Sequence, residues 1–351
     1  MAMSLATSHK ISTLQSFVFD IILMEEVLRF SNEAIQKSFD RKMEISNTNL
    51  TVVTEFFLTG FQGSQLLRNV LFLLFLIIYE ATMCGNLLII SLVLNSKNLH
   101  TPMYFFISQL SISDILVTTD IVPKMLHILL HNGGTITFIH CLTQFFFFCA
   151  AEVFECLLLT VMSYDRYVAI CNPLRYTSVM TNEFCVKLSA MCWLVGIFVT
   201  IIFTVPPAKL YFCGPNIINH FFCDPIPFVE LSCSDTFIVH LDFYILAVPI
   251  LIIPVTIIVV SYTYIVLAVL RIPSSTGRQK AFSTCSSHLI VVSIFYWTIF
   301  SVYVVPPHVL TLSVTKILSL LYTVFTPLVN PIIYSLKNKD IMKAVQGTFH
   351  K

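Results

Sequence analysis

Seven long apolar runs constrain this chain more than any other feature of its sequence. Each runs for about 18 residues or more with few charges, the length at which an α-helix crosses the hydrocarbon core of a membrane. The alternating pattern of a membrane barrel is absent, and lipid forces the backbone to satisfy its own hydrogen bonds, so the runs predict helices. They occupy residues 70–94, 104–130, 142–162, 186–206, 237–264, 282–305 and 317–336.

Composition supports a membrane protein. The chain is 56% hydrophobic and 11% charged, whereas charged residues make up about a quarter of a soluble domain. The formal net charge of +1 argues against binding nucleic acid through a basic field. We therefore predict an all-α membrane protein in which residues 70–336 form one seven-helix bundle. Inverted repeats typical of a transporter are not evident.

Lysine and arginine divide unequally between the two sides of the predicted bundle. If the segment before the first span is outside, the outer side from Met43 onward holds Arg68, Lys124, Lys209 and Lys316. The cytoplasmic side holds Lys97, Arg166, Arg175, Lys187, Arg271, Arg278, Lys280, Lys337, Lys339, Lys343 and Lys351. The positive-inside rule then predicts an extracellular N-terminus and a cytoplasmic C-terminus.

The segments before the first span have two interpretations. Residues 1–42 are more polar, and their longest apolar stretch, 21–24, is too short to span a membrane. They also lack the pattern of a signal peptide, so we interpret them as a disordered or mis-assigned extension, with a functional extracellular tail as the alternative. Residues 43–69 are expected to be an extracellular segment, and the sequon Asn49-Leu50-Thr51 predicts glycosylation at Asn49.

Cysteine placement predicts disulfides on the outer side. Cys141 stands at the outer start of the third span, and Cys213, Cys223 and Cys233 lie in the long loop after the fourth. Four cysteines in an oxidising space predict two disulfides, one of which must tie Cys141 to the loop. The residues alone leave three pairings open.

Ionisable residues inside the spans are candidates for function, because charge is costly in hydrocarbon. Asp114 and Glu155 lie deep within spans, and Glu152 lies one turn from Glu155 on roughly the same helix face. Asp165-Arg166-Tyr167 ends the third span, where the arginine can act as a contact or a latch. Zinc, Ser-His-Asp and phosphate-loop motifs are absent, so an enzyme is not expected.

At this point the chain resembles the olfactory receptors, a family of rhodopsin-like G-protein-coupled receptors, from about Met43 to its end. The motifs follow one another in the family's order. They are GN at 85–86, PMYFF at 102–106, LSISD at 110–114, PKML at 123–126, MSYDRYVAIC at 162–171, HFFCD at 220–224, SY at 261–262, KAFSTCSSH at 280–288 and PLVNPIIYSLKN at 327–338. The block at 280–288 separates olfactory receptors from amine, peptide and opsin relatives.

The resemblance implies a disulfide pairing and a polar cluster. It pairs Cys141 with Cys223 and leaves Cys213 with Cys233. It also implies that Asp114, Glu155 and Asn330 surround a sodium ion or a water network; the alternative is that one or both carboxyls are protonated and merely hydrogen-bonded. Apart from this sodium ion, no cofactor is expected.

The resemblance further implies how the receptor signals. Arg166 leaves Asp165 on activation, Tyr262 and Tyr334 swing inward, and the end of the third span, Tyr167 included, contacts a heterotrimeric G protein of the olfactory stimulatory type. Pro331 is expected to bend the seventh span. Residues 337–345, within the cytoplasmic tail 337–351, resemble a short amphipathic helix lying along the membrane lipid.

A ligand site is expected in the outer third of the bundle. The resemblance supplies its candidates, each of which is equally well interpreted as simple core packing. They are Phe148, Cys149, Glu152, Val153, Leu246, Ile250, Tyr296, Ile299, Phe300, Tyr303, Leu320 and Thr323. Glu152 stands out as a second buried carboxyl without an evident structural purpose. Trp297 replaces the glycine usual in the family, which puts the pocket's local shape in question.

Together these features predict an odorant receptor of the plasma membrane that binds a small volatile molecule and signals through cyclic AMP. A G-protein-coupled receptor for an endogenous metabolite, expressed outside the nose, is the alternative.

Overall fold

A computed structural model describes residues 53–303, 311–336, 341–344 and 346. The polar extension 1–42 and the sequon at Asn49 lie outside these residues. So does most of the expected amphipathic helix, of which residues 341–344 are helical and Ile341 is buried.

Within the described residues, seven helical segments are long and apolar enough to cross a membrane, as predicted. Six are the single helices α2 (Gln65–Asn95), α3 (Pro102–His131), α4 (Phe138–Cys171), α6 (Asn182–Thr204), α8 (Phe237–Leu270) and α9 (Ser275–Tyr303). The seventh runs from α10 (Leu312–Leu320) through the π-helical turn η4 (Leu321–Phe325) into α11 (Thr326–Leu336). Short helical turns occupy the connections: η1 (Lys97–Leu99), η2 (Pro173–Arg175), α5 (Tyr176–Val179), η3 (Pro207–Lys209) and α7 (Pro225–Glu230).

Several helices begin before the apolar run that predicted them, because polar caps rather than hydropathy set their first residues. Ser64 Oγ accepts a hydrogen bond from Leu67 N, and Thr137 Oγ1 does the same for His140 N. Each cap satisfies one of the backbone N–H groups that a helix start leaves unpaired.

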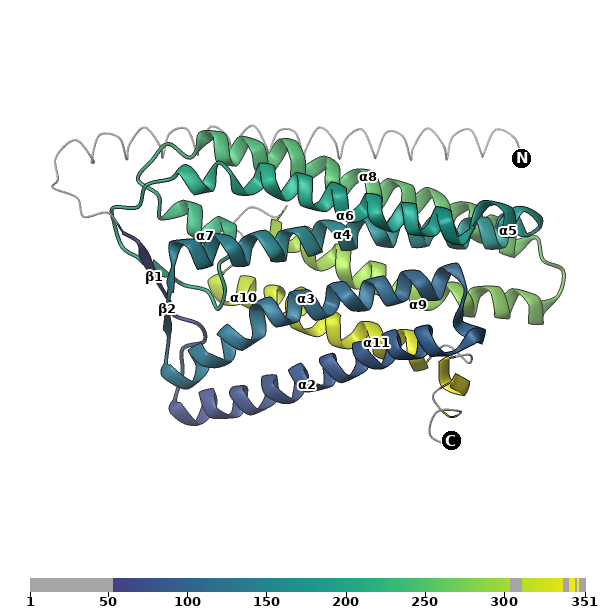
Figure 1. The fold of residues 1–351 in the computed structure, drawn as a ribbon, viewed down its shortest axis with the longest axis horizontal. Coiled ribbons are helices and arrows are strands. Elements are labelled where there is room, and N and C mark those ends of the chain that lie inside the picture. Colours follow the sequence, from purple (N-terminus) through teal and green to yellow (C-terminus); the bar gives the residue numbers. More distant parts are fainter. Residues whose placement is uncertain (1–52, 304–310, 337–340, 345, 347–351) are drawn as a thin grey trace.

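The helix α4 lies at the centre of the bundle and packs against α3, α6, α8 and α9. The helix α2 lies at one side, against α3 and α11 (Figure 1). Large apolar side chains cover the outer surface of the bundle, as on α8, where Ile245, Ile253 and Val259 are exposed. Such a surface suits a chain that lipid surrounds.

A small cap closes one end of the bundle, at the left of Figure 1. Within the described residues its sheet has the strand order β2-β1-β3, from β1 (Glu55–Leu58), β2 (Gly134–Thr137) and β3 (Ile217–Ile218). The pair β1–β2 is antiparallel and β1–β3 parallel. Phe56 and Leu58 are fully buried while Glu55 and Phe57 face outward. These strands, two of four residues and one of two, were not predicted, because they are too short to show a period in the sequence.

Lys316 ties the cap to the last membrane helix. Its Nζ donates hydrogen bonds to Gly60 O at 2.6 Å and to Asn219 Oδ1 at 2.8 Å. Thr59 Oγ1 donates to the same Asn219 oxygen at 2.8 Å. One buried ammonium therefore joins the segment before α2, the loop before α7 and helix α10.

Two buried titratable residues, His220 and Asp224, lie in the loop before α7. The His220 ring stacks on Phe221 and meets Phe222 edge-on, each with 4.6 Å between centroids. Burial, with the nearby Lys316 ammonium, lowers the pKa of His220 to about 3. Asp224 caps α7 by accepting from Ile226 N at 3.0 Å. Burial raises the pKa of Asp224 to about 7.

We expect Lys316→Met to lower the free energy of unfolding by about 1–3 kcal/mol, because Gly60 O then loses its donor in a buried place. Thermal unfolding of the purified receptor measures this. Lys187→Met is the matched control, since Lys187 and its partner Glu183 are exposed and such surface pairs contribute about 0–1 kcal/mol. Equal shifts in the two variants would contradict the role of Lys316.

The raised pKa of Asp224 predicts a pH dependence. Between the ordinary value of 3.8 and about 7 the folded protein keeps a proton that the unfolded chain releases, so this contribution to stability is lost as pH rises through the window. Asp224→Asn keeps the capping oxygen and removes the ionisation. As pH rises inside the window, the free energy of unfolding of the variant should increase relative to that of the wild type by roughly 1.4 kcal/mol per pH unit. His220, whose pKa is lowered, has the opposite slope in both proteins and cancels. If the free energies of unfolding of the two proteins differ by the same amount from acid to neutral pH, the raised pKa of Asp224 is refuted.

Candidate ligand site and transmission residues

The loop between α6 and α8 is fastened to α4. The described residues hold the disulfides Cys141–Cys223 and Cys213–Cys233, the pairing that the resemblance implied. One turn below Cys141, the Gln144 amide accepts from Cys223 N at 2.9 Å and donates to Asp120 O at 2.9 Å. The loop is thus held to α4 at two points and lies over the mouth of the bundle.

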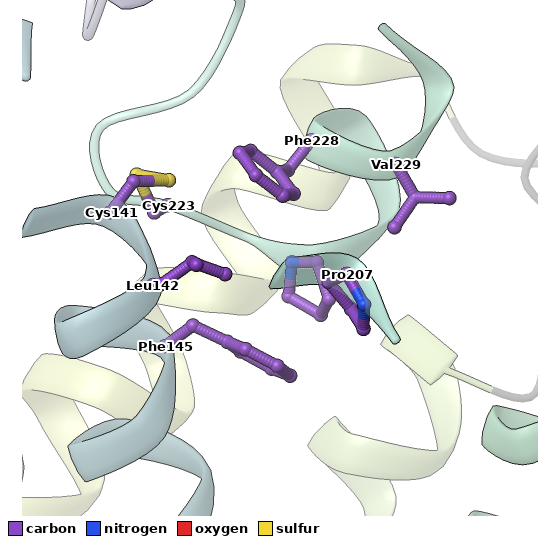
Figure 2. A pocket seen from close by; sticks show the side chains of 8 residues that line it. Cys141, Leu142, Phe145, Pro207, Cys223, Phe228 and Val229 are labelled. Atoms are coloured by element: carbon purple, nitrogen blue, oxygen red, sulfur yellow. A yellow bond between two sulfur atoms is a disulfide. The ribbon is translucent and has the colours of Figure 1, made fainter. Parts of the chain in front are cut away.

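The space beneath the disulfide is nearly filled. Figure 2 shows Phe145 and Leu142 of α4 pointing toward Pro207, with Phe228 and Val229 of α7 closing the other side. The cavity among them measures about 10 Å³, which is room for about one water molecule. This part of the cap acts as a packed plug and not as an odorant site.

Below the plug, three helical segments bring part of the predicted ligand set together. Phe148 of α4 lies 5.8 Å from the ring of Tyr322 in η4 and 5.4 Å from Phe222 of the loop. Tyr303 of α9 and Tyr322 share a hydrogen bond of 3.1 Å between hydroxyls. The Glu152 carboxyl is near enough to both tyrosine hydroxyls to interact with them electrostatically, which places it on the same side of α4.

Phe222 and Tyr322 were not among the predicted ligand residues. The first stands inside the HFFCD motif and the second directly precedes Thr323. A search for aromatic residues beside each candidate could have found both.

The remaining candidates divide among other surroundings. Cys149, Val153, Leu246 and Ile250 pack with Phe145 in a separate cluster between α4, α6 and α8. The deeper candidates and their neighbours behave as core residues. They are Tyr296, whose hydroxyl donates to Cys156 O at 2.9 Å, the buried Ile299, the half-buried Phe300, and Thr323, whose hydroxyl donates to Ser319 O at 2.7 Å. Leu320 instead is buried in the same apolar cluster as Phe148, Phe222 and Tyr322.

Trp297 does not reshape the pocket. Its side chain is 62% exposed on the outer surface of α9. Trp297 therefore faces the surroundings of the bundle and not its interior.

The polar cluster lies at mid-bundle. Asn330 Nδ2 donates to both carboxyl oxygens of Asp114, at 3.0 and 3.2 Å. Glu155 is 3% exposed and close enough to Asp114 for the two charges to repel. Among the described residues, no lysine or arginine forms an ion pair with either carboxyl. Oxygen donors of this kind suit a hard cation, so these residues fit a sodium ion.

The same level holds a tight contact between α2 and α11. Pro331 has no N–H, so the carbonyl of Pro327, four residues earlier, loses its helical donor. Asn86 Nδ2 donates to that carbonyl at 3.0 Å and to Thr82 O at 3.0 Å. Gly85 makes the approach possible, since a Cβ there would lie 3.2 Å from the Pro331 ring. The other end of the amide, Asn86 Oδ1, has no partner among the described residues.

At the end opposite the cap, Asp165 holds Arg166. The guanidinium donates to Asp165 Oδ2 through Nε at 2.9 Å and Nη2 at 2.5 Å. Tyr176 of α5, which was not predicted, donates to Asp165 Oδ1 at 2.8 Å. Burial and the Asp165 carboxylate raise the pKa of Tyr176, so its hydroxyl keeps the proton that it donates.

The neighbouring tyrosines differ in their partners. Tyr262 Oη lies 2.6 Å from His288 Nδ1, with the two rings stacked at 5.7 Å. This pairing could not be seen in the sequence, because Tyr262 lies on α8 and His288 on α9. The buried Tyr334 hydroxyl has no partner within the described part of the chain. Tyr167 is half-buried and contacts Tyr264 edge-on at 6.0 Å.

Comparison with known proteins gives the family. The family model for olfactory receptors matches residues 75–351. The chain is 47% identical to mouse olfactory receptor 5G25 over 303 residues, which cover 86% of this chain and 95% of that one. It is 45% identical to human olfactory receptor 11L1 over 310 residues, covering 88% and 95%. Mouse olfactory receptor 5G9 is 46% identical over 307 residues, covering 88% and 98%. The chain therefore belongs to the olfactory receptor family, whose members are multi-pass G-protein-coupled receptors and not enzymes.

Proposed function

We propose that this protein is an odorant receptor that binds a small volatile molecule beneath the cap and activates a stimulatory heterotrimeric G protein, raising cyclic AMP. The observation that carries the proposal is the course of α4. Phe148 and Glu152 stand on its cap side, and Asp165 with Arg166 ends the same helix. A ligand that repositions α4 against α9 and α11 acts directly on the element that bears the arginine.

The proposed orientation places the cap outside the plasma membrane and the Arg166 end in the cytoplasm. Disulfides form in oxidising compartments, and both described disulfides belong to the cap end. Lys97, Arg175 and Arg271 follow or precede membrane helices at the other end, which suits the positive-inside rule. Membrane lipid covers the apolar outer surface between the two ends.

The Arg166 end is proposed to be the G-protein contact. In this structure Asp165 occupies the guanidinium with two hydrogen bonds, so Arg166 is not free to bind a partner. Activation requires Arg166 to leave Asp165 and Tyr262 to leave His288. Tyr334, whose hydroxyl has no partner among the described residues, is placed to accept a new contact.

A sodium ion is proposed at Asp114, Glu155 and Asn330. Two neighbouring carboxylates without a counter-ion are costly in a buried place, and a bound cation relieves that cost. The ion would supply positive charge that holds α3, α4 and α11 together. These residues bind and orient it, and Asn330 keeps Asp114 in position.

We expect Arg166→Ala to abolish the ligand-induced rise in cyclic AMP while leaving surface expression near normal. The test is a cyclic-AMP reporter in cells, screened with a broad panel of volatiles and normalised to surface labelling. Arg175→Ala, which removes an exposed charge at the same end, is the matched control and should respond like the wild type. An Arg166→Ala receptor at normal surface level with a normal response would contradict the assignment.

Sodium should raise the unfolding temperature of the purified receptor relative to choline at equal ionic strength. Each tenfold excess of sodium over its dissociation constant contributes about 1.4 kcal/mol. Asp114→Asn should remove most of this difference, because it removes the charge that the ion neutralises. Glu80→Gln, an exposed carboxyl on α2, should keep it. A wild-type receptor that unfolds identically in the two salts would rule out the ion.

A further inference from the structure

We infer that the Glu152 carboxyl is the polar anchor of the ligand site and that it selects neutral volatiles carrying one oxygen acceptor, such as aldehydes, ketones and alcohols. The inference rests on the proposed function and names the ligand class of that site. In it, the carboxyl is neutral and its O–H donates a hydrogen bond to the ligand oxygen.

The first support is an unsatisfied buried atom. Glu152 is 9% exposed, and its Oε2 makes no hydrogen bond with any described residue. Leaving a buried polar group unpaired costs about 1–3 kcal/mol. The structure thus shows a carboxyl oxygen that is shielded from water and still lacks a partner, which is what a ligand with a complementary polar atom would supply.

The second support is the charge around it. Glu155 lies three residues further along the same helix, and both Glu155 and Asp114 are close enough for their charges to oppose that of Glu152. No arginine or lysine forms an ion pair with Glu152 in the described part of the chain. The proposed sodium ion carries one positive charge, so it neutralises at most one of the two carboxyls of that cluster. An ionised Glu152 would therefore be a third acidic charge beside a cluster that is not fully neutralised, which is strongly unfavourable.

The third support is the set of side chains around the carboxyl. Phe148, one turn earlier on α4, is packed against Phe222 and Tyr322. The Tyr303 and Tyr322 hydroxyls are engaged with each other. The site therefore offers aromatic walls with one uncommitted carboxyl, and it matches a molecule with an apolar body and a single oxygen.

An amine is the competing ligand class. It would be held by an ionised Glu152, since the ligand itself would supply the missing counter-ion. The two classes respond differently to Glu152→Gln, which keeps the size and the hydrogen-bonding capacity of the side chain but removes its charge. Glu152→Leu removes the hydrogen bond as well and keeps the bulk.

The experiment measures cyclic AMP at matched surface levels with straight-chain volatiles of equal length: an alkane, an alcohol, an aldehyde, a ketone and an amine. The wild type should respond to the oxygen-bearing members. In Glu152→Gln their half-maximal concentrations should stay within about tenfold of the wild type. In Glu152→Leu they should rise by tenfold or more, which corresponds to at least about 1.4 kcal/mol. Glu80→Gln and Glu80→Leu are the matched controls and should change nothing.

A measurement without ligand keeps the inference testable. Infrared difference spectra of wild type against Glu152→Gln should show loss of the carbonyl stretch of a protonated carboxyl. Glu183→Gln, which removes an exposed carboxylate paired with Lys187 at the start of α6, should not show that loss. Loss of an ionised carboxylate band instead would overturn the inference.

Other outcomes separate the inference from the proposed function. A preference for the amine that Glu152→Gln abolishes, or unchanged responses in Glu152→Leu, would overturn the anchor while leaving the odorant receptor intact. A well-expressed wild-type receptor that no volatile in the broad panel activates would contradict the proposed function itself.

Discussion

A carbonyl group that a proline leaves without its helical donor organises the middle of this bundle. In hydrocarbon, water cannot replace the lost N–H, so another helix must supply the donor. Asn86 supplies it to Pro327, and Gly85 lets the two backbones come close enough. The contact fixes α2 against α11, and Asn330, next to the proline, then reaches Asp114 on α3. The missing N–H of Pro331 thereby sets how the helices α2, α3 and α11 pack against one another.

The central helix α4 combines the other constraints. Its cap end is fixed by a disulfide and by Gln144, and its far end carries the Asp165–Arg166 pair, which Tyr176 braces. Between these ends, its faces serve different neighbours. One side meets Tyr322 and the loop, and another meets Phe203 and Phe243 through Phe145. A displacement of α4 therefore cannot remain local.

The sequence was sufficient for the seven helices, because the thickness of the membrane dictates a length that any long apolar run reveals. It also singled out Asp114 and Glu155, since buried charge is rare enough to notice, whereas Asn330 was added to them only by the family resemblance. The sequence could not separate the ligand candidates that lie together from those that pack elsewhere. The helix α4 is apolar on most of its circumference, so nothing in the sequence distinguishes the face of Phe148 from the face of Val153. The partners Tyr176 and His288 also escaped prediction, as each depends on which helices meet. The cap strands were too short to leave a pattern.

The Lys316 contact has a consequence for biosynthesis. Its acceptor Gly60 precedes the first membrane helix, 256 residues earlier in the chain. A ribosome makes the acceptor first and the donor last, so the Lys316 contact can form only after the seventh helix has been made. The strand partners of β1 both precede α10 in the chain, so the sheet can pair before this contact exists. Lys316 then joins the segment just after the first strand of the fold to its last membrane helix, and this tie is the last part of the cap to form.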